Sequence, residues 1–316
     1  MKLEQLEHFV AVVEHGSLRA AARSLQVAQP ALTRSIRLLE KELGAALFVR
    51  SITGMTVTPA GCQFLRRART VINDLRRAAE EVRQTDGDDR GNVTVALSIM
   101  PHVGMLPGAL LDFRRRWPRV RIEILEGPLP DIEQGLRDGR IDFYIGIAPQ
   151  DMLAPGLMVQ HLFTNQRAIF CRKGHPLSGA RALKTLAAAE WAVTSVDYDA
   201  SEHLSAIFRH HGLPSPEVIV RVRSVASILM GIAHSDAMAM LPIQCSQSPM
   251  SASMLHQVRV REELPPTPIV LIQRADVPLT PASEYFCDAL LRQGPNVEHG
   301  PPRKRGTPRN QRRPAP

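Results

Sequence analysis

Residues 27–44 have the sequence VAQPALTRSIRLLEKELG, which predicts the second helix of a helix-turn-helix. Pro30 suits the first turn of a helix, where a backbone N–H has no partner within the helix. Apolar side chains then follow at spacings of four, three and four, on Leu32, Ile36, Leu39 and Leu43. The pattern indicates an amphipathic helix that ends at Gly44, with Lys41 near its negative end.

Two more helices are predicted before this stretch. The first carries one apolar stripe and ends near Gly16; the stripe consists of Leu3, Leu6, Phe9 or Val10, and Val13. Ser17 has the small hydroxyl side chain that caps a helix, and a short second helix continues through Ala20, Ala21, Ala22 and Leu25. Residues 26–28 form the turn, so the three helices fit a helix-turn-helix.

The outward face of the third helix gathers hydrogen-bond donors suited to base edges and phosphates, on Gln29, Thr33, Arg34, Arg37 and Lys41. The alternative is an ordinary three-helix bundle with a solvated, charged face, since such faces are common. Acidic residues appear only at the far end of the helix, at Glu40 and Glu42. Their position favours DNA reading.

A longer helical pattern follows, with an alternating three and four spacing on Leu65, Ala68, Ile72, Leu75, Ala79 and Val82. This narrow stripe is typical of a coiled-coil seam that pairs with one partner helix. Packing against the core of the same chain is the alternative. Five arginines lie outside the seam, namely Arg66, Arg67, Arg69, Arg76 and Arg77. Residues 84–91 then break the helix, and we expect them to act as a hinge.

Past Gly91 the pattern changes to alternating strands and helices, which predicts a mostly parallel sheet. Strands are expected at 93–97, 120–125, 141–147, 168–171, 191–194, 218–221, 238–241 and 269–273. Helices are expected at 105–116 and 131–138.

The amino-terminal residues closely resemble the DNA-binding domain of LysR-type transcriptional regulators. The matching positions, in order, are Leu6, Phe9 and Val10, Gly16 and Ser17, Ala21 and Ala22, Val27 to Arg34, Ile36, Leu39 and Glu40, Leu43 and Gly44, Leu47 to Arg50, and Thr58 to Gly61. The resemblance implies a winged helix-turn-helix, an α domain with a short β wing, over residues 1–60.

In that family Gln29, Pro30, Thr33 and Arg34 would face the major groove, and residues 47–58 would form a wing with Arg50 at the DNA backbone or minor groove. Arg37 and Ser17 complete our set of DNA-binding residues. Two positions depart from the family pattern: Ala28 replaces a serine that would cap the helix, and residues 51–57 of the wing carry no basic side chain. Recognition is therefore expected to depend more on the third helix.

The resemblance extends, more loosely, to the rest of the chain. Its landmarks are Leu106 and Pro107, Phe113 and Pro118, Glu126 and Gly127, Gly139 to Asp142, His175 to Leu177, Asp236 to Pro242, and Pro278 to Pro281. It implies a dimerising linker helix and hinge over 61–90. An α/β effector-binding domain would follow over 91–292, built in two lobes like a type 2 periplasmic binding protein. Lobe I would comprise 91–164 and 268–292, and lobe II 165–267.

Ligands of open parallel sheets bind beyond the carboxyl ends of the strands, so the effector site is expected between the lobes. The candidates that follow strand ends are Ser98, Met100, Pro101, His102, Gly127, Pro128, Ile147, Ser195, Tyr198 and Ser224. Hydroxyls and backbone amides at helix starts bind carboxylates well, although each serine can equally be a helix cap. Relatives that bind aromatic acids often have a hydroxyl where this chain has Met100, which puts the usual carboxylate contact in doubt.

The net charge of +8 is unevenly distributed: 14 basic and 11 acidic residues in 1–90, 19 of each in 91–292, and 6 against 1 in 293–316. The last segment is rich in Pro, Gly and Arg and is expected to be a disordered basic tail. We expect no signal peptide, because an amphipathic helix starts at once, and no membrane span. Four dispersed cysteines fit a reduced cytoplasmic setting. The expected DNA binding would place the protein on the nucleoid.

Catalytic and metal-binding patterns are not apparent. Cys171 and His175 are separated by the end of a strand and a turn, and the adjacent His210 and His211 would point apart on a helix. The sequence also has no glycine-rich phosphate loop. We therefore expect no metal, no cofactor and no enzyme activity.

The sequence thus predicts a sequence-specific transcription regulator that responds to a small-molecule co-inducer. Its expected partners are promoter DNA, a second copy through the linker helix, a homotetramer, RNA polymerase and the effector, with no membrane. One alternative is the solute-binding protein of a transporter, which the helix-turn-helix and the missing secretion signal disfavour. The second alternative is an enzyme that acts on a small anion in the same cleft. The sequence lacks the catalytic groups that such an enzyme needs.

Overall fold

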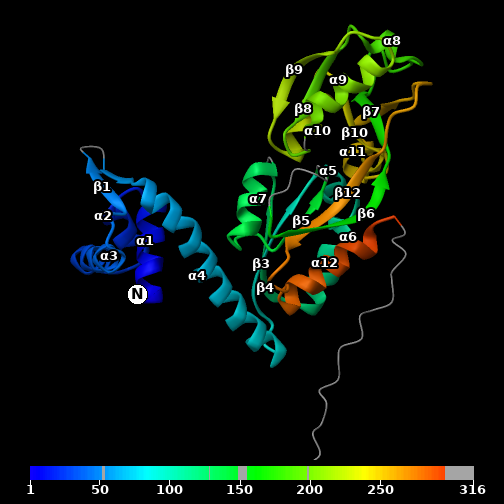
Figure 1. Ribbon diagram of the computed structural model, residues 1–316. Helices are drawn as coiled ribbons and strands as arrows, with labels where there is room; N and C mark the ends of the chain where they lie inside the picture. Colours follow the sequence, from blue (N-terminus) through cyan, green and yellow to red (C-terminus); the bar gives the residue numbers. More distant parts are fainter. Residues whose placement is uncertain (52–53, 128, 149–154, 198, 296–316) are drawn as a thin grey trace, which may run out of the picture.

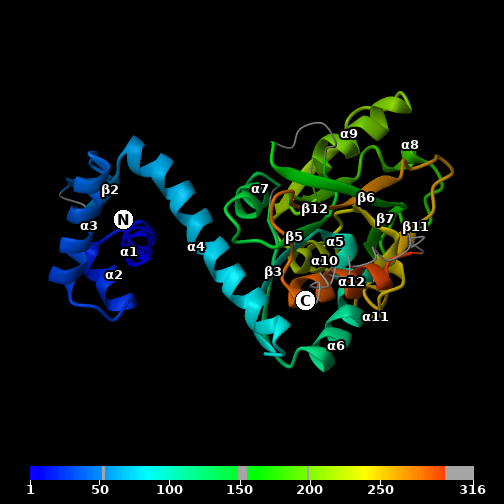
Figure 2. The same ribbon diagram turned by 60° about the horizontal axis from the view of Figure 1, so that its bottom comes forward.

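The computed structural model describes residues 1–51, 54–127, 129–148, 155–197 and 199–295. An amino-terminal module, the long helix α4 (Pro59–Thr85) and a two-lobed domain follow one another along the chain. Both views show the module standing apart from the lobes, with α4 running between them (Figures 1 and 2). None of the helices in the described ranges has the length and hydropathy that crossing a bilayer requires.

The amino-terminal module is the predicted winged helix-turn-helix. It contains α1 (Leu3–His15), α2 (Leu18–Ser24), α3 (Gln29–Leu43), β1 (Phe48–Ser51) and β2 (Gly54–Val57). Gly16 and Gly44 end α1 and α3 in the left-handed region, at φ of 66° and 65°. The buried ring of Phe9 lies 5.3 Å from the rings of both Phe48 and Phe64, so one core joins the helices, the wing and the start of α4.

Helix α4 presents three different faces. Leu65, Ala68 and Ile72 pack into the core of the amino-terminal module, so this half of the predicted seam follows the alternative reading. Asn73, Arg77, Glu80 and Gln84 face lobe I. The third face is apolar and exposed, and consists of Val71, Leu75, Ala79 and Val82. Only this face remains for a partner helix.

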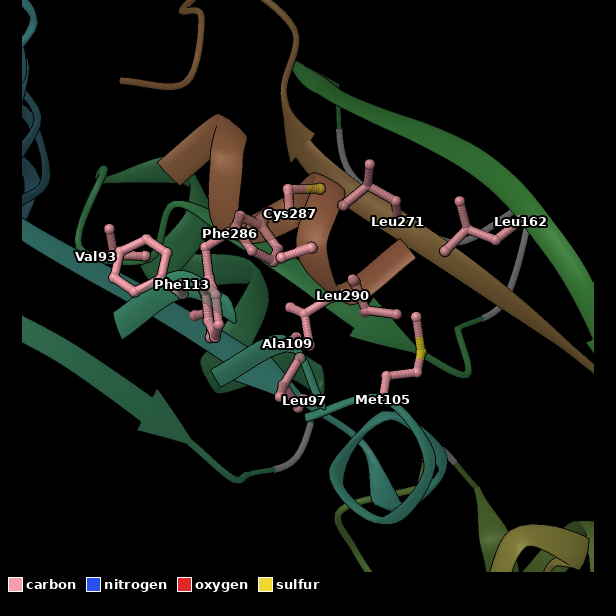
Figure 3. Packing of buried hydrophobic residues seen from close by; sticks show 14 of the residues in the cluster. Val93, Leu97, Met105, Ala109, Phe113, Leu162, Leu271, Phe286, Cys287 and Leu290 are labelled. Carbon is pink, nitrogen blue, oxygen red and sulfur yellow. The ribbon is translucent and has the colours of Figure 1, made fainter. Parts of the chain in front are cut away.

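Lobe I is built on a five-stranded sheet in the order β4-β3-β5-β12-β6. These strands are β3 (Arg90–Leu97), β4 (Arg119–Leu125), β5 (Phe143–Gly146), β6 (Leu157–Asn165) and β12 (Thr267–Arg274). Helices α6 (Leu106–Arg116) and α12 (Pro281–Gln293) cover one face, and α7 (Leu129–Arg137) packs on the other. Phe113 of α6 and Phe286 of α12 meet edge to face, 5.0 Å between ring centroids, in the cluster shown in Figure 3.

Lobe II contains two further sheets, β10-β7-β11 and β8-β9. Its strands are β7 (Arg167–Arg172), β8 (Glu190–Thr194), β9 (Glu217–Val222), β10 (Ala239–Pro242) and β11 (Leu255–Val258). Its helices are α8 (Leu183–Leu186), α9 (Ala200–His210), α10 (Val225–Ala233), the 3-10 turn η1 (Ile243–Ser246) and α11 (Pro249–Ala252). Between the lobes lies α5 (Ile99–Gly104): Ile99 packs into the core of lobe II, and Met100 into that of lobe I.

The predicted mostly parallel sheet is correct only in part. β3 pairs in parallel with β4 and β5, and β8 with β9. In contrast, β12 is antiparallel to β5 and β6, and β7 is antiparallel to β10 and β11. Alternation of strands and helices predicts parallel pairing. The rule fails for β12 and β7, which pair antiparallel with their neighbours.

The aromatic cluster of lobe I gives a stability test. We expect Phe286→Ala to lower the free energy of unfolding by about 3–5 kcal/mol, because removing the ring leaves a cavity among fully buried side chains. Arg115→Ala, on the exposed side of α6, should change it by less than about 0.5 kcal/mol. Urea unfolding of both variants measures this, and equal midpoints would contradict the packing described.

Candidate DNA interface and effector cleft

Helix α3 exposes the predicted DNA-reading face. Leu32, Ile36 and Leu39 are buried, whereas Gln29, Pro30, Arg34 and Arg37 are exposed, and Thr33 is half-buried with its hydroxyl donating to the Gln29 carbonyl at 2.9 Å. No described residue forms a hydrogen bond or ion pair with the side chains of Arg34 or Arg37. The structure thus brings these donors together and leaves both guanidinium groups available to a partner.

Contacts with the module core fix the position of α3. His8 Nδ1 lies 2.8 Å from Ser35 Oγ, and Glu40 Oε1 accepts from the backbone N–H groups of Leu47 at 2.8 Å and Phe48 at 3.2 Å. Glu40 therefore joins the recognition helix to the first strand of the wing. The sequence alone gave Glu40 no structural role, because its partners Leu47 and Phe48 lie in the next element of the chain.

Two further predicted DNA contacts lie outside α3. Ser17 is half-buried and its hydroxyl accepts from Ala20 N at 3.1 Å, so it caps α2 as predicted. Arg50 lies in β1 opposite Met55, and its side chain lies outside the described residues. Ala28 makes no side-chain cap to α3, as its sequence implied. The DNA contacts of Ser17 and Arg50 stay predictions.

A buried ion pair joins α4 to lobe I. Arg77 Nη2 lies 2.6 Å from Asp142 Oδ1, with 5% and 7% of the two side chains exposed. Arg77 also donates to the carbonyls of Gly139 at 3.3 Å and Ile141 at 3.1 Å, and Asp142 Oδ2 accepts from Thr94 N at 2.8 Å. Burial raises the pKa of the Asp142 carboxyl, and the Arg77 charge opposes that rise.

More contacts on the same face of α4 support this pair. Asn73 donates to the Asp138 carbonyl at 2.7 Å, and Arg274 lies 2.6 Å from Asp74. Near the end of the helix, Gln84 Oε1 accepts from Ala282 N at 3.0 Å, and Gln84 Nε2 donates to the Arg90 carbonyl at 3.1 Å. Helix α4 ends at Thr85, within the predicted break, and Gln84 at the start of the expected hinge is buried and makes both of these hydrogen bonds.

Helix α4 joins the amino-terminal module (1–58) to the two-lobed domain (90–295). An open hollow of about 940 Å³ lies between α4 and lobe I. Phe64 and Arg67 of α4 line one side, and Arg137 and Arg274 of lobe I line the other. Helix α4 thus makes polar contacts with lobe I through Asn73, Arg77 and Gln84. The sequence reading named Arg77 only as a residue outside the seam.

Several of the predicted effector residues are inaccessible in this conformation. Ser98, Met100, Pro101 and Ile147 are buried, and Met100 packs in the lobe I core rather than lining an open cleft. Burial follows because α5 begins directly after β3 and packs into both lobes. Two more candidates, Pro128 and Tyr198, lie outside the described residues.

The remaining candidates lie where the lobes meet. His102 Nδ1 is 3.0 Å from the Ser98 carbonyl, and its Nε2 is 3.5 Å from Glu126 Oε1. Glu126, next to Gly127, accepts from Val225 N of lobe II at 2.6 Å through Oε2. Ser224 Oγ accepts from Ser227 N at 3.0 Å and so caps α10, which agrees with the helix-cap alternative. Ser195 Oγ donates weakly to the Val222 carbonyl at 3.5 Å.

The sequence reading missed a second buried ion pair at this junction. Arg167 Nη2 lies 3.5 Å from Asp197 Oδ2, with 2% and 1% of their side chains exposed. Arg167 also donates to the Met240 carbonyl at 2.6 Å, and Asp197 Oδ1 accepts from Ile99 N at 3.5 Å. Burial raises the pKa of Asp197 and lowers that of Arg167. No pattern in the sequence distinguishes these two residues from surface charges.

The side chains considered for catalysis or metal binding have structural partners. Cys171, in β7, is buried, and burial raises the pKa of its thiol to about 11. His175 Nε2 lies 3.0 Å from the Asp236 carbonyl, and its Nδ1 accepts from Leu177 N at 3.0 Å. Within the described ranges, no three His, Cys, Asp or Glu side chains are grouped as metal ligands.

The fold and these surfaces define a class of protein: a helix-turn-helix module connected by one long helix to a two-lobed domain of the kind that binds small molecules. Family models agree with this description. Residues 3–62 match the model for "Bacterial regulatory helix-turn-helix protein, lysR family", and residues 86–295 match "LysR substrate binding domain". The chain belongs to the LysR family and is a DNA-binding transcription regulator with a substrate-binding domain, as the resemblance predicted.

Relatives of known name are regulators too. The chain is 29% identical over 295 residues to the SDS degradation transcriptional activation protein of Pseudomonas sp. (strain ATCC 19151), covering 92% of this chain and 95% of that protein. It is 28% identical over 297 residues to the regulator GbpR of Azospirillum brasilense, covering 92% and 86%. The crystal structure of CbnR, a LysR family regulator, shares the fold with a TM-score of 0.68 at 23% identity, over 94% of this chain and 100% of CbnR.

The Arg77–Asp142 pair gives a second test of stability. Arg77→Met leaves a buried carboxylate without its countercharge, and we expect it to lower the free energy of unfolding by about 3–5 kcal/mol. The double variant Arg77→Met/Asp142→Asn should recover part of this loss, because no unpaired charge remains. Denaturant unfolding of Arg77→Met, Asp142→Asn and the double variant measures this. If the loss in the double variant equals the sum of the two single losses, the two side chains do not interact.

The four cysteines give a third test. Cys62 is exposed, whereas Cys171, Cys245 and Cys287 are buried, and burial raises the pKa of Cys171 to about 11 and that of Cys245 to about 12. A thiol reagent at neutral pH should therefore modify one cysteine in the native protein and four after denaturation. Rapid native modification of more than one thiol would contradict the burial.

Proposed function

We propose that the chain recognises an operator as a dimer, with one α3 helix in each of two major-groove half-sites, and that a small-molecule effector bound between the lobes changes this recognition. The observation that carries the proposal is the exposed α3 face, where Gln29, Thr33, Arg34 and Arg37 lie together above a buried apolar stripe. A complex of CbnR with its target DNA, at 24% identity and a TM-score of 0.66 over 93% of this chain and 100% of CbnR, supports DNA binding through this fold.

A second copy would pack on the third face of α4, where Val71, Leu75 and Val82 are 52%, 51% and 64% exposed. A homotetramer needs a second, independent interface. Leu111 on α6 and Ile219 and Met230 on β9 and α10 are exposed apolar side chains suited to it. Two dimers joined in this way would place four α3 helices along one DNA segment.

Regulation would require neither a cofactor nor catalysis, since an effector that binds two lobe arrangements unequally shifts their populations. The names of the relatives, all transcriptional regulators, support a role without enzyme activity. Contact with RNA polymerase at the promoter, and a cytoplasmic location on the nucleoid, follow from this proposal. A transporter's solute-binding protein would have no use for the amino-terminal module.

The DNA-reading face can be tested with DNA that the wild-type protein selects from a random pool. Arg34→Ala and Gln29→Ala should each lower affinity for this DNA about 5- to 150-fold, since a bidentate base contact contributes about 1–3 kcal/mol. Arg115→Ala, an exposed arginine on α6, is the matched control and should bind normally. Full retention of the selected DNA by Arg34→Ala in a gel shift would overturn the assignment.

The linker interface can be tested by sedimentation. Leu75→Lys places a charge in the centre of the exposed apolar face of α4, so the oligomer should fall to a lower order. Glu81→Lys changes an exposed residue on the same helix and should leave the mass unchanged. Wild-type mass for Leu75→Lys would exclude this face as the dimer interface.

A further inference from the structure

Strand β11 has a free edge in lobe II. It is an outer strand of the sheet β10-β7-β11 and pairs antiparallel with β7. Directly before β11, Lys173 N donates to the Met254 carbonyl at 3.3 Å, and the main-chain groups of an antiparallel strand point alternately to its two sides. The even-numbered residues of β11 therefore bond to β7. The N–H and C=O groups of Leu255 and Gln257 point to the free edge, which Figure 2 shows on the side of lobe II away from α4.

A groove of about 450 Å³ lies along this edge. Two of its lining residues, Phe170 and Leu255, belong to the apolar cluster on one face of the sheet. Two others, Ser178 and Arg181, lie in the loop whose Leu177 packs with the cluster on the opposite face. Because its walls come from both faces of the sheet, the groove surrounds the edge of β11 and leaves it open to a partner.

Hydrogen bonds hold the walls of the groove in place. Buried His175 lies 3.0 Å from the Asp236 carbonyl through Nε2, which fixes the loop that leads to Arg181. On the other wall, Ser251 Oγ donates to the Cys245 carbonyl at 2.7 Å and so joins α11 to η1. A partner that enters the groove therefore meets a surface that is already ordered, which lowers the entropy cost of binding.

The groove is basic within a domain of balanced charge. Its walls and floor belong to residues 171–189 and 243–261 together with Phe170, and these two segments contain six Lys or Arg and no Asp or Glu. Arg181 and Arg259 line the groove and are exposed. Within the described ranges, neither guanidinium group has an ion-pair or hydrogen-bond partner. The charge therefore favours an acidic occupant.

The chain directly after β11 shows that a main-chain partner can bind here. Arg261 N donates to the Arg181 carbonyl at 3.0 Å, so the loop from the far face already pairs with the chain three residues past the end of the strand. An exposed strand edge offers the same kind of contact to any extended segment that reaches it. Leu255 and Gln257 continue this row of main-chain groups into the groove.

We propose that the β11 edge is a docking site for an extended, acidic segment of another protein, which adds to the sheet β10-β7-β11 as a further strand. Its main chain pairs with Leu255 and Gln257, and its carboxylates contact Arg181 and Arg259. The surface is formed by lobe II alone and involves neither α3 nor the lobe junction. The proposal therefore goes beyond the proposed function and does not depend on it.

The probe is the fluorescently labelled peptide acetyl-Glu-Val-Glu-Val-Glu-amide, in which valine favours an extended chain. The full-length protein should bind it, and should not bind the same peptide with lysine in place of each glutamate. The double variant Arg181→Gln/Arg259→Gln should lower the affinity about 2- to 30-fold through the loss of two exposed ion pairs. Arg223→Gln, an exposed arginine directly after β9, is the matched control and should bind normally. Fluorescence anisotropy measures each affinity.

A second pair of variants tests strand pairing itself. Gln257→Pro removes an N–H that points to the free edge and keeps the hydrogen bonds to β7, a position where strands accept proline. It should lower the affinity for the peptide about 2- to 12-fold, the effect of one lost hydrogen bond. Gln257→Ala keeps the N–H and should bind like wild type.

If Gln257→Pro does not fold, hydrogen exchange of the wild type replaces it. The bound peptide should slow exchange at Gln257 N and leave His256 N unchanged, because the latter already bonds to β7. Absence of peptide binding by the wild type, or equal binding of the lysine peptide, would overturn the proposal. Wild-type affinity of Gln257→Pro, or unchanged exchange at Gln257, would also contradict it, since the arginines would then attract carboxylates without any added strand.

Discussion

The Arg77–Asp142 ion pair is the contact on which the arrangement of the whole chain depends. Both side chains are buried, and Asp142 also accepts from Thr94 of β3, so the pair joins the linker helix directly to the central sheet of lobe I. A buried pair of this kind adds little net stability, but the loss of one partner leaves an uncompensated charge. We expect the pair to specify one orientation of α4, the helix that joins the DNA-reading module to the lobes.

This attachment changes the expected route of regulation. Residues 84–91 do not separate linker from lobe, because Gln84 is bonded to both Arg90 and Ala282. We therefore expect lobe I and the second half of α4 to move as one unit. Thr94 lies in β3 and Asp142 directly precedes β5; the two strands end at Leu97 and Gly146, directly before Ser98 and Ile147. These two strands connect the lobe junction to the Arg77–Asp142 pair within one sheet.

Local patterns in the sequence predicted most of the amino-terminal module. Apolar spacing, Pro30, Gly16, Gly44 and the cap at Ser17 each act within a few residues, and the structure confirms them. The sequence could not show which part of the α4 stripe is buried. Leu65 and Leu75 follow the same spacing, but Leu65 packs into the amino-terminal core whereas Leu75 is exposed. Antiparallel β12 and the pairs Arg77–Asp142, Arg167–Asp197 and Glu126–Val225 depend on residues far apart in the chain. The effector candidates stay predictions, and four of them, Ser98, Met100, Pro101 and Ile147, are buried.

Native-state hydrogen exchange tests most directly whether α4 and lobe I form one rigid unit. Under conditions where exchange reports opening free energies, amides at 73–84 of α4 should open with the same free energy as those of β3, in one cooperative unit. Amides at 73–84 that open with a much lower free energy than β3 would contradict the account. Such a result would show that the linker helix moves independently of the lobe.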